Sequence, residues 1–395
     1  MAGYGSVARR LLVPDVLGRH AHAFWFKPHA GELEPLAARA LVLETGAVRL
    51  VWVAVDLVAV DRTFTAEVTE AVTRVLGTPG PVIVSASHTH SGPGAFIDSR
   101  LMGFLAADQL DRAVRDALIH AVVEAVGRAG AARVRARLGT LAVAGPLVTR
   151  GRLPHPPDRD LVVTKIVSLD GAPIAIVWNY AIHGTMLGPG NLRASGDVMG
   201  VASRQLEREL GAPALFVNGT VGDVSPARHG RQAALEVGAQ LAHAVRIVWE
   251  RIDASEDRPS IKIRTARVAL PAPALSVHNC VARWVPRGLS VPLGRAWPRD
   301  ATLTAVALGG AAAAVTVPGE LQSALGTRVK DEARRWWRHP FVAGVSNDYL
   351  GYFVTAADYD RVSYVTCASV YGPTAGEQLA RAASEVLREL GEDQR

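Results

Sequence analysis

The stretch SASHTHSGPGAF, residues 85–96, is the part of the chain that says most about the fold and the site. The apolar run VIV at 82–84 directly before it predicts a buried strand, and the Gly-Pro-Gly at 92–94 predicts a turn. His88 and His90 therefore lie where the strand ends. Because residues i and i+2 of an extended chain point to the same side, both imidazoles project together. Such a pair can begin a zinc site, although a hydrogen-bonded surface pair has the same pattern.

Four further stretches place histidine, serine, glutamate or tyrosine beside glycine and proline turns. In chain order they are NYAIHGTM (179–186), NGTVGDVSPA (218–227), VPGELQSALG (317–326) and SNDYLGYFVTAADYDRVSYVTCASVYGP (346–373). Together with HTHSGPG, and in this order, they resemble the catalytic domain of the neutral ceramidases. Members of that family are zinc-dependent amidases that split the amide of N-acylsphingosine. The resemblance extends over roughly residues 30–385.

The resemblance implies four zinc ligands, which are His88, His183, Glu320 and Tyr352. Each has an ordinary structural alternative. A lone buried histidine is commonly only hydrogen-bonded, and a glutamate at a helix start commonly complements the helix dipole. A tyrosine binds zinc only as a phenolate or a strongly hydrogen-bonded phenol, and the metal itself can supply that pKa shift. The motifs around these residues favour the metal site.

The resemblance also implies four catalytic residues. Ser225 in GDVSP matches the family's nucleophile, and His90 is a proton carrier beside the metal rather than a ligand. Arg150 in VTRGR matches an arginine that contacts substrate oxygens, and Tyr364 has the spacing of a tyrosine that stabilises the oxyanion. The sequence leaves open whether Ser225 or a water molecule attacks the amide carbonyl, and whether His90 is merely packed against the site.

Periodicity of the apolar residues predicts alternating strands and helices. The predicted strands cover 38–43, 48–60, 82–87, 134–143, 161–169, 174–181, 214–217, 302–308, 313–317 and 342–346. The predicted helices cover 63–76, 109–129, 198–210, 231–252, 321–337 and 379–390. Hairpins mixed with βα units favour an α/β fold with a mixed β-sheet core flanked by helices. We expect one large neutral-ceramidase-like domain over 1–395, without an internal repeat and without the family's immunoglobulin-like second domain.

Charge and composition exclude some classes of protein. The net charge of +6 is spread along the chain, so nothing predicts nucleic-acid binding. The soft apolar run 305–318 contains a Gly-Gly turn and predicts two strands, so we expect no stable association with a membrane. The start of the chain lacks the apolar segment of a secretion signal, which predicts a cytoplasmic protein. Cys280 and Cys367 follow no CxxC pattern and are expected to be free thiols.

The sequence therefore predicts a zinc-dependent amidohydrolase that takes a soluble, small-molecule N-acyl amide. The family's GDVSPN is GDVSPA here, with Ala227 in place of the asparagine, and the run after PGE also differs. These changes alter the wall of the pocket and not its ligands, which makes ceramide a doubtful substrate. The alternatives are a true ceramidase, an amide- or ester-forming acyltransferase with the same zinc site, a metallophosphatase, and a metal sensor without turnover. The oligomeric state is not predicted.

Overall fold

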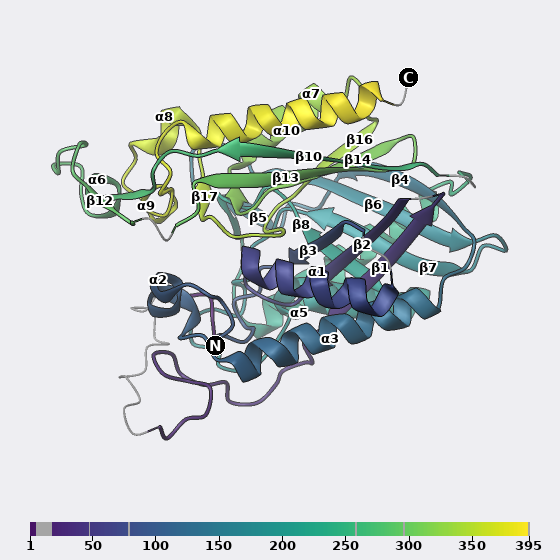
Figure 1. Ribbon diagram of the computed structural model, residues 1–395, viewed down its shortest axis with the longest axis horizontal. Helices are drawn as coiled ribbons and strands as arrows, with labels where there is room; N and C mark the ends of the chain where they lie inside the picture. The colour runs from purple at the N-terminus through teal and green to yellow at the C-terminus, as the bar shows by residue number, and fades with distance from the viewer. Residues whose placement is uncertain (5–17, 47, 78–79, 257–258, 295–296, 394–395) are drawn as a thin grey trace.

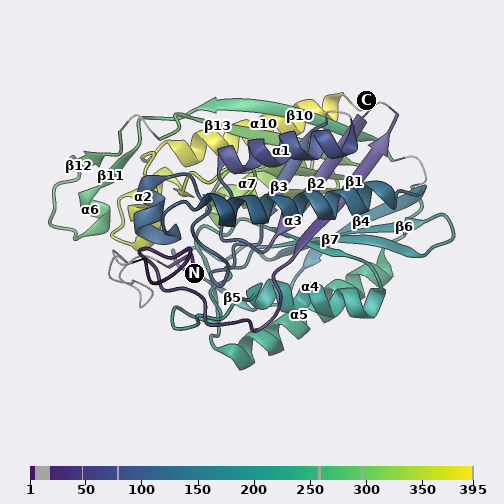
Figure 2. The same cartoon turned by 60° about the horizontal axis from the view of Figure 1, so that its bottom comes forward.

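The computed structural model describes residues 1–4, 18–46, 48–77, 80–256, 259–294 and 297–393. These residues form three main β-sheets, each covered on its outer side by a pair of long helices (Figures 1 and 2). The mixed α/β fold with helices flanking a β-sheet core is thereby confirmed, with three sheets in the core.

The first sheet has the strand order β1-β2-β3. Strands β1 (Ala38–Thr45) and β2 (Val48–Val55) form an antiparallel hairpin, and β3 (Val82–Ala86) lies parallel to β2. Helix α1 (Arg62–Leu76) connects β2 to β3, and α3 (Arg112–Ala131) packs beside α1. The predicted hairpin and both helices are confirmed to within a few residues, except that β2 ends at Val55, earlier than expected.

Local sequence signals account for the position of α1. The Asp61 carboxylate accepts a hydrogen bond from the Phe64 backbone N–H and so caps the first turn. Phe64, Val68 and Val72, spaced four apart, form the stripe that packs on the sheet. Gly77 ends the helix with φ of 72°, a left-handed conformation that suits glycine. The helix therefore begins and ends where its sequence predicts.

The second sheet has the order β4-β6-β7-β8, with β4, β6 and β7 antiparallel and β8 parallel to β7. Helix α4 connects β7 to β8, and α5 follows β8. The bounds are Ala136–Ala144 (β4), Asp160–Ser168 (β6), Pro173–Tyr180 (β7), Asp197–Leu210 (α4), Ala214–Asn218 (β8) and Arg231–Arg251 (α5).

The third sheet has the order β10-β13-β14-β16, with β10, β13 and β14 antiparallel and β16 parallel to β14. Helix α7 connects β14 to β16, and α10 runs across the outside of the sheet (Figure 1). The bounds are Ile261–Ala269 (β10), Asp300–Leu308 (β13), Ala312–Thr316 (β14), Ser323–Ala333 (α7), His339–Ala343 (β16) and Ala375–Glu392 (α10).

The same arrangement of elements occurs in all three sheets. An antiparallel hairpin is followed by a crossover helix, a parallel strand and an outer helix, as in β1-β2-α1-β3-α3 and β6-β7-α4-β8-α5. The order of elements is therefore repeated three times among the described residues, although the sequence shows no internal repeat. Equivalent strands of the three units end on the same side of the molecule, and the loops after them meet there.

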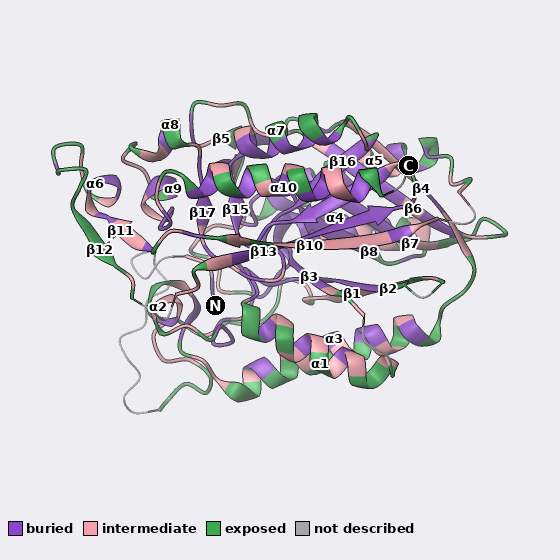
Figure 3. Cartoon of the chain, turned by 45° about the horizontal axis from the view of Figure 1, so that its top comes forward, coloured by how far each residue is buried: buried purple, intermediate pink, exposed green. Residues whose placement is uncertain are grey.

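The three inner sheet faces share one hydrophobic core. Trp52, Val177 and Phe341 come from the first, second and third sheet respectively, and each is at most 2% exposed. The rings of Trp52 and Phe341 stack with centroids 6.3 Å apart. Burying a large apolar side chain contributes about 1.5–3 kcal/mol to the free energy of unfolding. In Figure 3 most strands of the three main sheets are buried, the edge strand β10 is of intermediate burial, and the long helices α1, α3 and α10 are exposed along their outer sides.

Short elements gather at the end of the molecule where the strand loops meet, left in Figure 1. They are β5 (Thr149–Gly151) paired with β9 (Val224–Pro226), β15 (Glu320–Leu321) paired with β17 (Tyr352–Phe353), β11 (Ala274–Ser276) paired with β12 (Ser290–Pro292), α2 (Arg100–Met102), the π-helix η1 (Gly103–Ala107), α6 (Val277–Cys280), α8 (Ala356–Tyr359) and α9 (Tyr364–Cys367). None of these was predicted.

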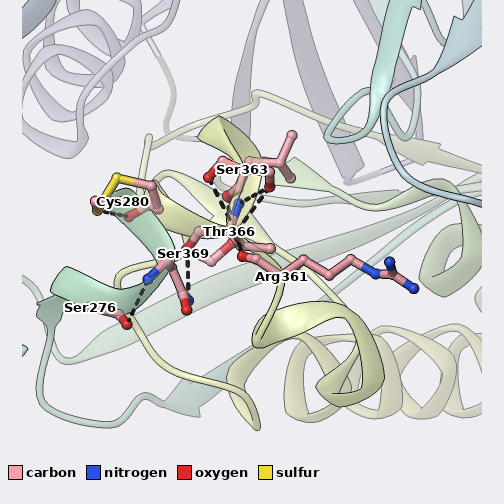
Figure 4. The surroundings of a disulfide bond; sticks show 9 residues. Ser276, Cys280, Arg361, Ser363, Thr366 and Ser369 are labelled. Atoms are coloured by element: carbon pink, nitrogen blue, oxygen red, sulfur yellow. Dashed lines mark hydrogen bonds between the residues drawn. A yellow bond between two sulfur atoms is a disulfide. The ribbon is translucent and has the colours of Figure 1, made fainter. Parts of the chain in front are cut away.

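The expectation of free thiols is wrong. Cys280, at the end of α6, and Cys367, at the end of α9, form a disulfide across 87 residues of chain (Figure 4). No motif marks this pair, because the folded loops alone bring the two cysteines together. The disulfide links the segment β11-α6-β12 to α9, the short helix that begins with Tyr364.

No helix among the described residues combines the length and the apolar character that crossing a bilayer requires. The run 305–318 forms the end of β13, a turn and β14, as predicted.

Candidate metal centre

The predicted metal ligands lie at strand ends that converge from all three sheets. His88 and His90 follow β3, and His183 follows β7. Glu320 lies shortly after β14, behind the Pro318-Gly319 turn, and Tyr352 begins β17. Glu320 and Tyr352 stand opposite each other in the parallel pair β15–β17, so their side chains lie on the same face. The fold thus brings together all four predicted ligands.

The donor atoms of these side chains are close to one another. The Nε2 atoms of His88 and His183 are 3.1 Å apart. One carboxylate oxygen of Glu320, Oε1, is 3.2 Å from His88 Nε2, and the other, Oε2, is 3.3 Å from His183 Nε2. All three side chains are at most 2% exposed. The cluster is therefore compact and closed off from bulk water.

His90 lies directly beside the predicted ligands. Its Nε2 atom is 3.5 Å from His88 Nε2, and one nitrogen from each of His88, His90 and His183 lies within 4.8 Å of the others. These three buried histidines are a group that could hold a metal ion. His90 is therefore a candidate ligand as well as the predicted proton carrier.

Backbone contacts bring the two histidine loops together. The His90 backbone N–H donates to the Gly184 carbonyl over 2.8 Å, and a Cβ added to Gly184 would collide with the His88 carbonyl oxygen. His88 itself has φ of 67°, a conformation that non-glycine residues rarely adopt and that clusters at functional sites. Gly184 is therefore required for the close approach of the His88 and His183 loops.

Neighbouring groups orient the ligands toward a common point. His88 Nδ1 is 2.5 Å from the Val58 carbonyl oxygen, which can only accept, so Nδ1 carries the proton and Nε2 presents a lone pair. The Tyr349 hydroxyl donates to Glu320 Oε1 over 2.6 Å. The other oxygen, Oε2, is buried and accepts no hydrogen bond. An orphaned buried carboxylate oxygen beside imidazole lone pairs suits a cation with nitrogen and oxygen ligands, of which zinc is typical.

The electrostatics of the cluster agree with this fit. Burial first, and then the positive charge of Arg152, hold the pKa of His183 well below its usual value, so this imidazole stays neutral. Burial, together with the negative charge of Glu320, raises the pKa of Tyr349 and of Tyr352 well above 10. Both phenols are thus protonated in the metal-free protein, and a bound cation would favour the phenolate.

The predicted nucleophile Ser225 lies on β9, beside an arginine that the sequence did not single out. Arg152 donates through Nε to Ser225 Oγ over 2.5 Å, and its backbone N–H donates to the Asp223 carbonyl over 2.6 Å. The predicted Arg150 stands opposite Ser225 in the pair β5–β9, but its side chain is exposed. Both arginines occur in TRGR, and the chain leaves the strand after Gly151. Because the strand ends there, Arg152 and not Arg150 contacts Ser225. The pattern of apolar residues does not reveal this end of the strand.

The last predicted catalytic residue, Tyr364, lies at the mouth of the site. Its ring meets the Tyr352 ring edge-on with centroids 5.7 Å apart, while 65% of the residue is exposed. Tyr364 also lines a cavity of about 50 Å³ together with His88, His90 and Glu320. A much larger groove of about 1170 Å³ runs along β1 and the C-terminal half of α3, but none of the candidate residues lines it. The small cavity is therefore the candidate active site.

A buried carboxylate behind the cluster joins the two ligand-bearing strands. Asp358 accepts hydrogen bonds from Gln322, two residues after Glu320, and from Thr355, three residues after Tyr352. It also pairs with His155 over 2.7 Å and with Arg361 over 2.6 Å. Burial alone would raise the pKa of Asp358, but these hydrogen bonds outweigh it and lower the pKa to about 2.

We expect Asp358→Asn to destabilise the protein in a pH-dependent way. The native pKa of about 2 lies below the unfolded value, so the ionised carboxylate stabilises the fold above pH 4, and this contribution is lost as the pH falls toward 2. At pH 7 the variant should lose about 2 kcal/mol in free energy of unfolding. Urea unfolding at several pH values measures the difference from wild type. A difference that stays the same between pH 7 and pH 2 would contradict this role.

Comparison with known proteins supports the resemblance seen in the motifs. The model of the neutral/alkaline non-lysosomal ceramidase N-terminal domain matches residues 29–240. Neutral ceramidase B of Dictyostelium discoideum is 25% identical over 221 residues, which cover 49% of this chain and 31% of that protein. A neutral ceramidase of Oryza sativa subsp. japonica is 26% identical over 195 residues, 44% of this chain and 25% of that protein. The chain thus spans under a third of the length of these relatives.

The fold has a solved counterpart. The crystal structure of the neutral ceramidase from Pseudomonas aeruginosa superposes with a TM-score of 0.80 at 19% identity, covering 99% of this chain and 73% of that one. At 19% identity the structural similarity shows only that the two proteins share a fold. The family model matches more than half of the chain, and that match shows membership of the family. The chain belongs to the neutral/alkaline non-lysosomal ceramidase family.

Proposed function

We propose that the protein is a zinc-dependent amidohydrolase that cleaves the amide bond of a soluble N-acyl substrate. The observation that carries this proposal is the convergence of buried His88, His183 and Glu320, together with Arg152, which holds Ser225 and whose charge acts on His183. A pure binding site has no need for a serine held by an arginine next to its ligands. The relatives reported above are named neutral ceramidases, which supports amide hydrolysis as the type of reaction.

His88, His183, Glu320 and Tyr352 would hold the zinc, and His90 lies beside them, where it can carry a proton. Bound there, zinc supplies Lewis acidity that polarises the amide carbonyl, a weak electrophile on its own. Imidazole nitrogens and a carboxylate whose free oxygen faces the cluster are the donors that this metal prefers.

The remaining steps belong to side chains of the protein. Arg152 holds Ser225 Oγ in one position, where it can attack the carbonyl carbon. His90 receives the proton that the nucleophile releases and passes it to the departing amine nitrogen, which cannot leave as an anion. The Tyr364 hydroxyl, at the mouth of the cavity, donates a hydrogen bond to the developing oxyanion. Water then releases the acyl group as a carboxylic acid.

The size of the cavity supports a soluble substrate over ceramide. A volume of about 50 Å³ beside the cluster is far below what two long hydrocarbon chains occupy. Sites for drug-sized ligands measure about 300–1,000 Å³. The relatives' names remain the argument for ceramide as the alternative substrate. The predicted location is the cytoplasm, but the Cys280–Cys367 disulfide favours an oxidising compartment, because such bonds are rare in cytosolic proteins.

A panel of N-acyl amides tests the proposal. We expect the zinc-loaded protein to hydrolyse small, polar N-acyl amides and to show a kcat/KM for long-chain ceramide in detergent at least ~10-fold lower, because the ceramide chains find no room beside the cluster. Release of the free amine measures turnover. A clear preference for ceramide would restore plain ceramidase as the function, and turnover of no amide at all would contradict the proposal.

A further inference from the structure

The first four residues of the chain lie against the candidate active site. Met1 is 7% exposed and Ala2 is fully buried. The Ala2 backbone N–H donates to the Gly92 carbonyl over 3.3 Å, and the Gly3 N–H donates to the Ala106 carbonyl over 2.9 Å. Both views of the chain place the N-terminus beside α2, at the end of the molecule where the strand loops meet (Figures 1 and 2). The segment Met1–Tyr4, called here the N-terminal segment, is thus packed into the fold.

The N-terminal segment contacts both histidine loops of the site. Gly3 has φ of 103°, and a Cβ added to it would be 2.8 Å from the His90 ring. The Tyr4 ring meets the His90 ring with centroids 4.9 Å apart, and the Tyr4 hydroxyl donates to the Thr185 carbonyl over 3.3 Å. Thr185 lies two residues after His183. The segment therefore bridges the loops that carry His90 and His183, and Gly3 allows its backbone to lie directly on the imidazole.

The N-terminal segment is one wall of the cavity beside the cluster. Gly3 lines the cavity together with Met102, Ala106 and Ala107. The candidate ligands and their neighbours form the rest of the lining. Its volume is about 50 Å³. This volume is far smaller than the roughly 300–1,000 Å³ of sites for drug-sized ligands, so the cavity suits only a small group beside the cluster. An acetyl group fits this space, whereas a longer acyl chain would collide with the N-terminal segment or η1.

We propose that the N-terminal segment sets the length of the acyl group that the enzyme accepts, and that its substrates are N-acetyl or similarly short N-acyl amides. The inference rests on the proposed amidohydrolase function. In the reaction the amide C–N bond breaks, water supplies the oxygen of the carboxylate, and the amine leaves with a proton. A substrate with a longer acyl chain requires the segment to leave His90.

Deletion of residues 2–4 from the full, zinc-loaded chain tests the proposal. The substrates are N-acetyl and N-hexanoyl derivatives of one amine, and the readout is the ratio of their kcat/KM values. Wild type should prefer the acetyl substrate at least ~10-fold, and the deletion should raise the hexanoyl-to-acetyl ratio at least ~10-fold. A wild-type enzyme that takes both substrates equally, or a ratio that the deletion leaves unchanged, overturns the proposal.

A point variant covers the case in which the deletion disturbs folding. Gly3→Val places a branched side chain against the His90 ring and should push the segment away, raising the same ratio. Gly31→Val is the matched control, because Gly31 has a similar φ of 90° but nothing within 4 Å of an added Cβ. Both substitutions carry the same backbone strain, so only Gly3→Val should change the ratio. An equal change in both variants contradicts a specific role of the segment.

Ligand binding separates failure of this inference from failure of the proposed function. Calorimetry measures acetate and hexanoate binding to the zinc-loaded wild type and to the deletion variant, without any turnover. Hexanoate should bind the deletion variant at least ~10-fold more tightly than wild type, while acetate affinity stays within about threefold. Equal hexanoate affinities would overturn the inference even in an active amidase. The expected difference in affinity would support it even if no amide in the panel were hydrolysed.

Discussion

The double variant His88→Ala, His183→Ala is expected to purify without zinc and to lose amidase activity at least ~1,000-fold. The two imidazoles contribute neighbouring donor atoms 3.1 Å apart, and Glu320 alone cannot replace them. Wild type should contain about one zinc per chain, the stoichiometry of a single site. Elemental analysis of both proteins measures the metal, and release of free amine measures the activity.

A buried histidine elsewhere is the control for that experiment. His339 on β16 is 7% exposed and lies outside the cluster, so His339→Ala should keep its zinc and its activity while it loses some stability. Near-stoichiometric zinc in the double variant would show that the metal binds at another place in the chain.

Ser225→Ala and Arg152→Ala are each expected to lower kcat/KM at least ~100-fold while the zinc content stays unchanged. The serine hydroxyl is the proposed nucleophile, and Arg152 is the side chain that holds it, through a hydrogen bond of 2.5 Å. Neither residue belongs to the group of side chains that would hold the metal. Loss of activity with full metal occupancy therefore separates catalysis from metal binding.

Arg150→Ala is the matched comparison, because it removes an exposed arginine two residues away on the same segment. We expect its kcat/KM to stay within about threefold of wild type, as is usual for a surface substitution. A large loss in Arg150→Ala with a small one in Arg152→Ala would assign the role to the arginine that the sequence motif indicates. Wild-type turnover in Ser225→Ala would exclude the serine as the nucleophile.

The long elements of the fold could be predicted from the sequence, because strong apolar periodicity marks them. β10 could not, since the alternation of apolar and charged residues in 261–264 breaks off at Thr265, along a half-exposed strand at the edge of its sheet. The three-unit topology was also missed. It repeats the order of elements without repeating residues, and one sequence offers no signal for that.

The site was predictable to the extent that short motifs mark it. His88, His183, Glu320 and Tyr352 each lie beside a turn that the motif itself contains, and the fold brings all four together. The motif around Arg150 does not show that Arg152, two residues later, donates a hydrogen bond to Ser225.

Contacts between distant segments carry no sequence motif at all. The disulfide between Cys280 and Cys367, the Asp358 network and the N-terminal segment on His90 all depend on how the loops fold over the strand ends. Such contacts become visible only in three dimensions.

Zinc titration into chelator-treated wild-type protein tests the central claim most directly. Amidase activity on a small N-acyl amide is followed as zinc is added in fractions of an equivalent. Activity should be absent without metal, rise linearly, and reach its plateau at about one zinc per chain, because one cluster of ligands serves the reaction. Full activity in the metal-free protein, or one bound zinc without any turnover of amides, would contradict a zinc-dependent amidohydrolase.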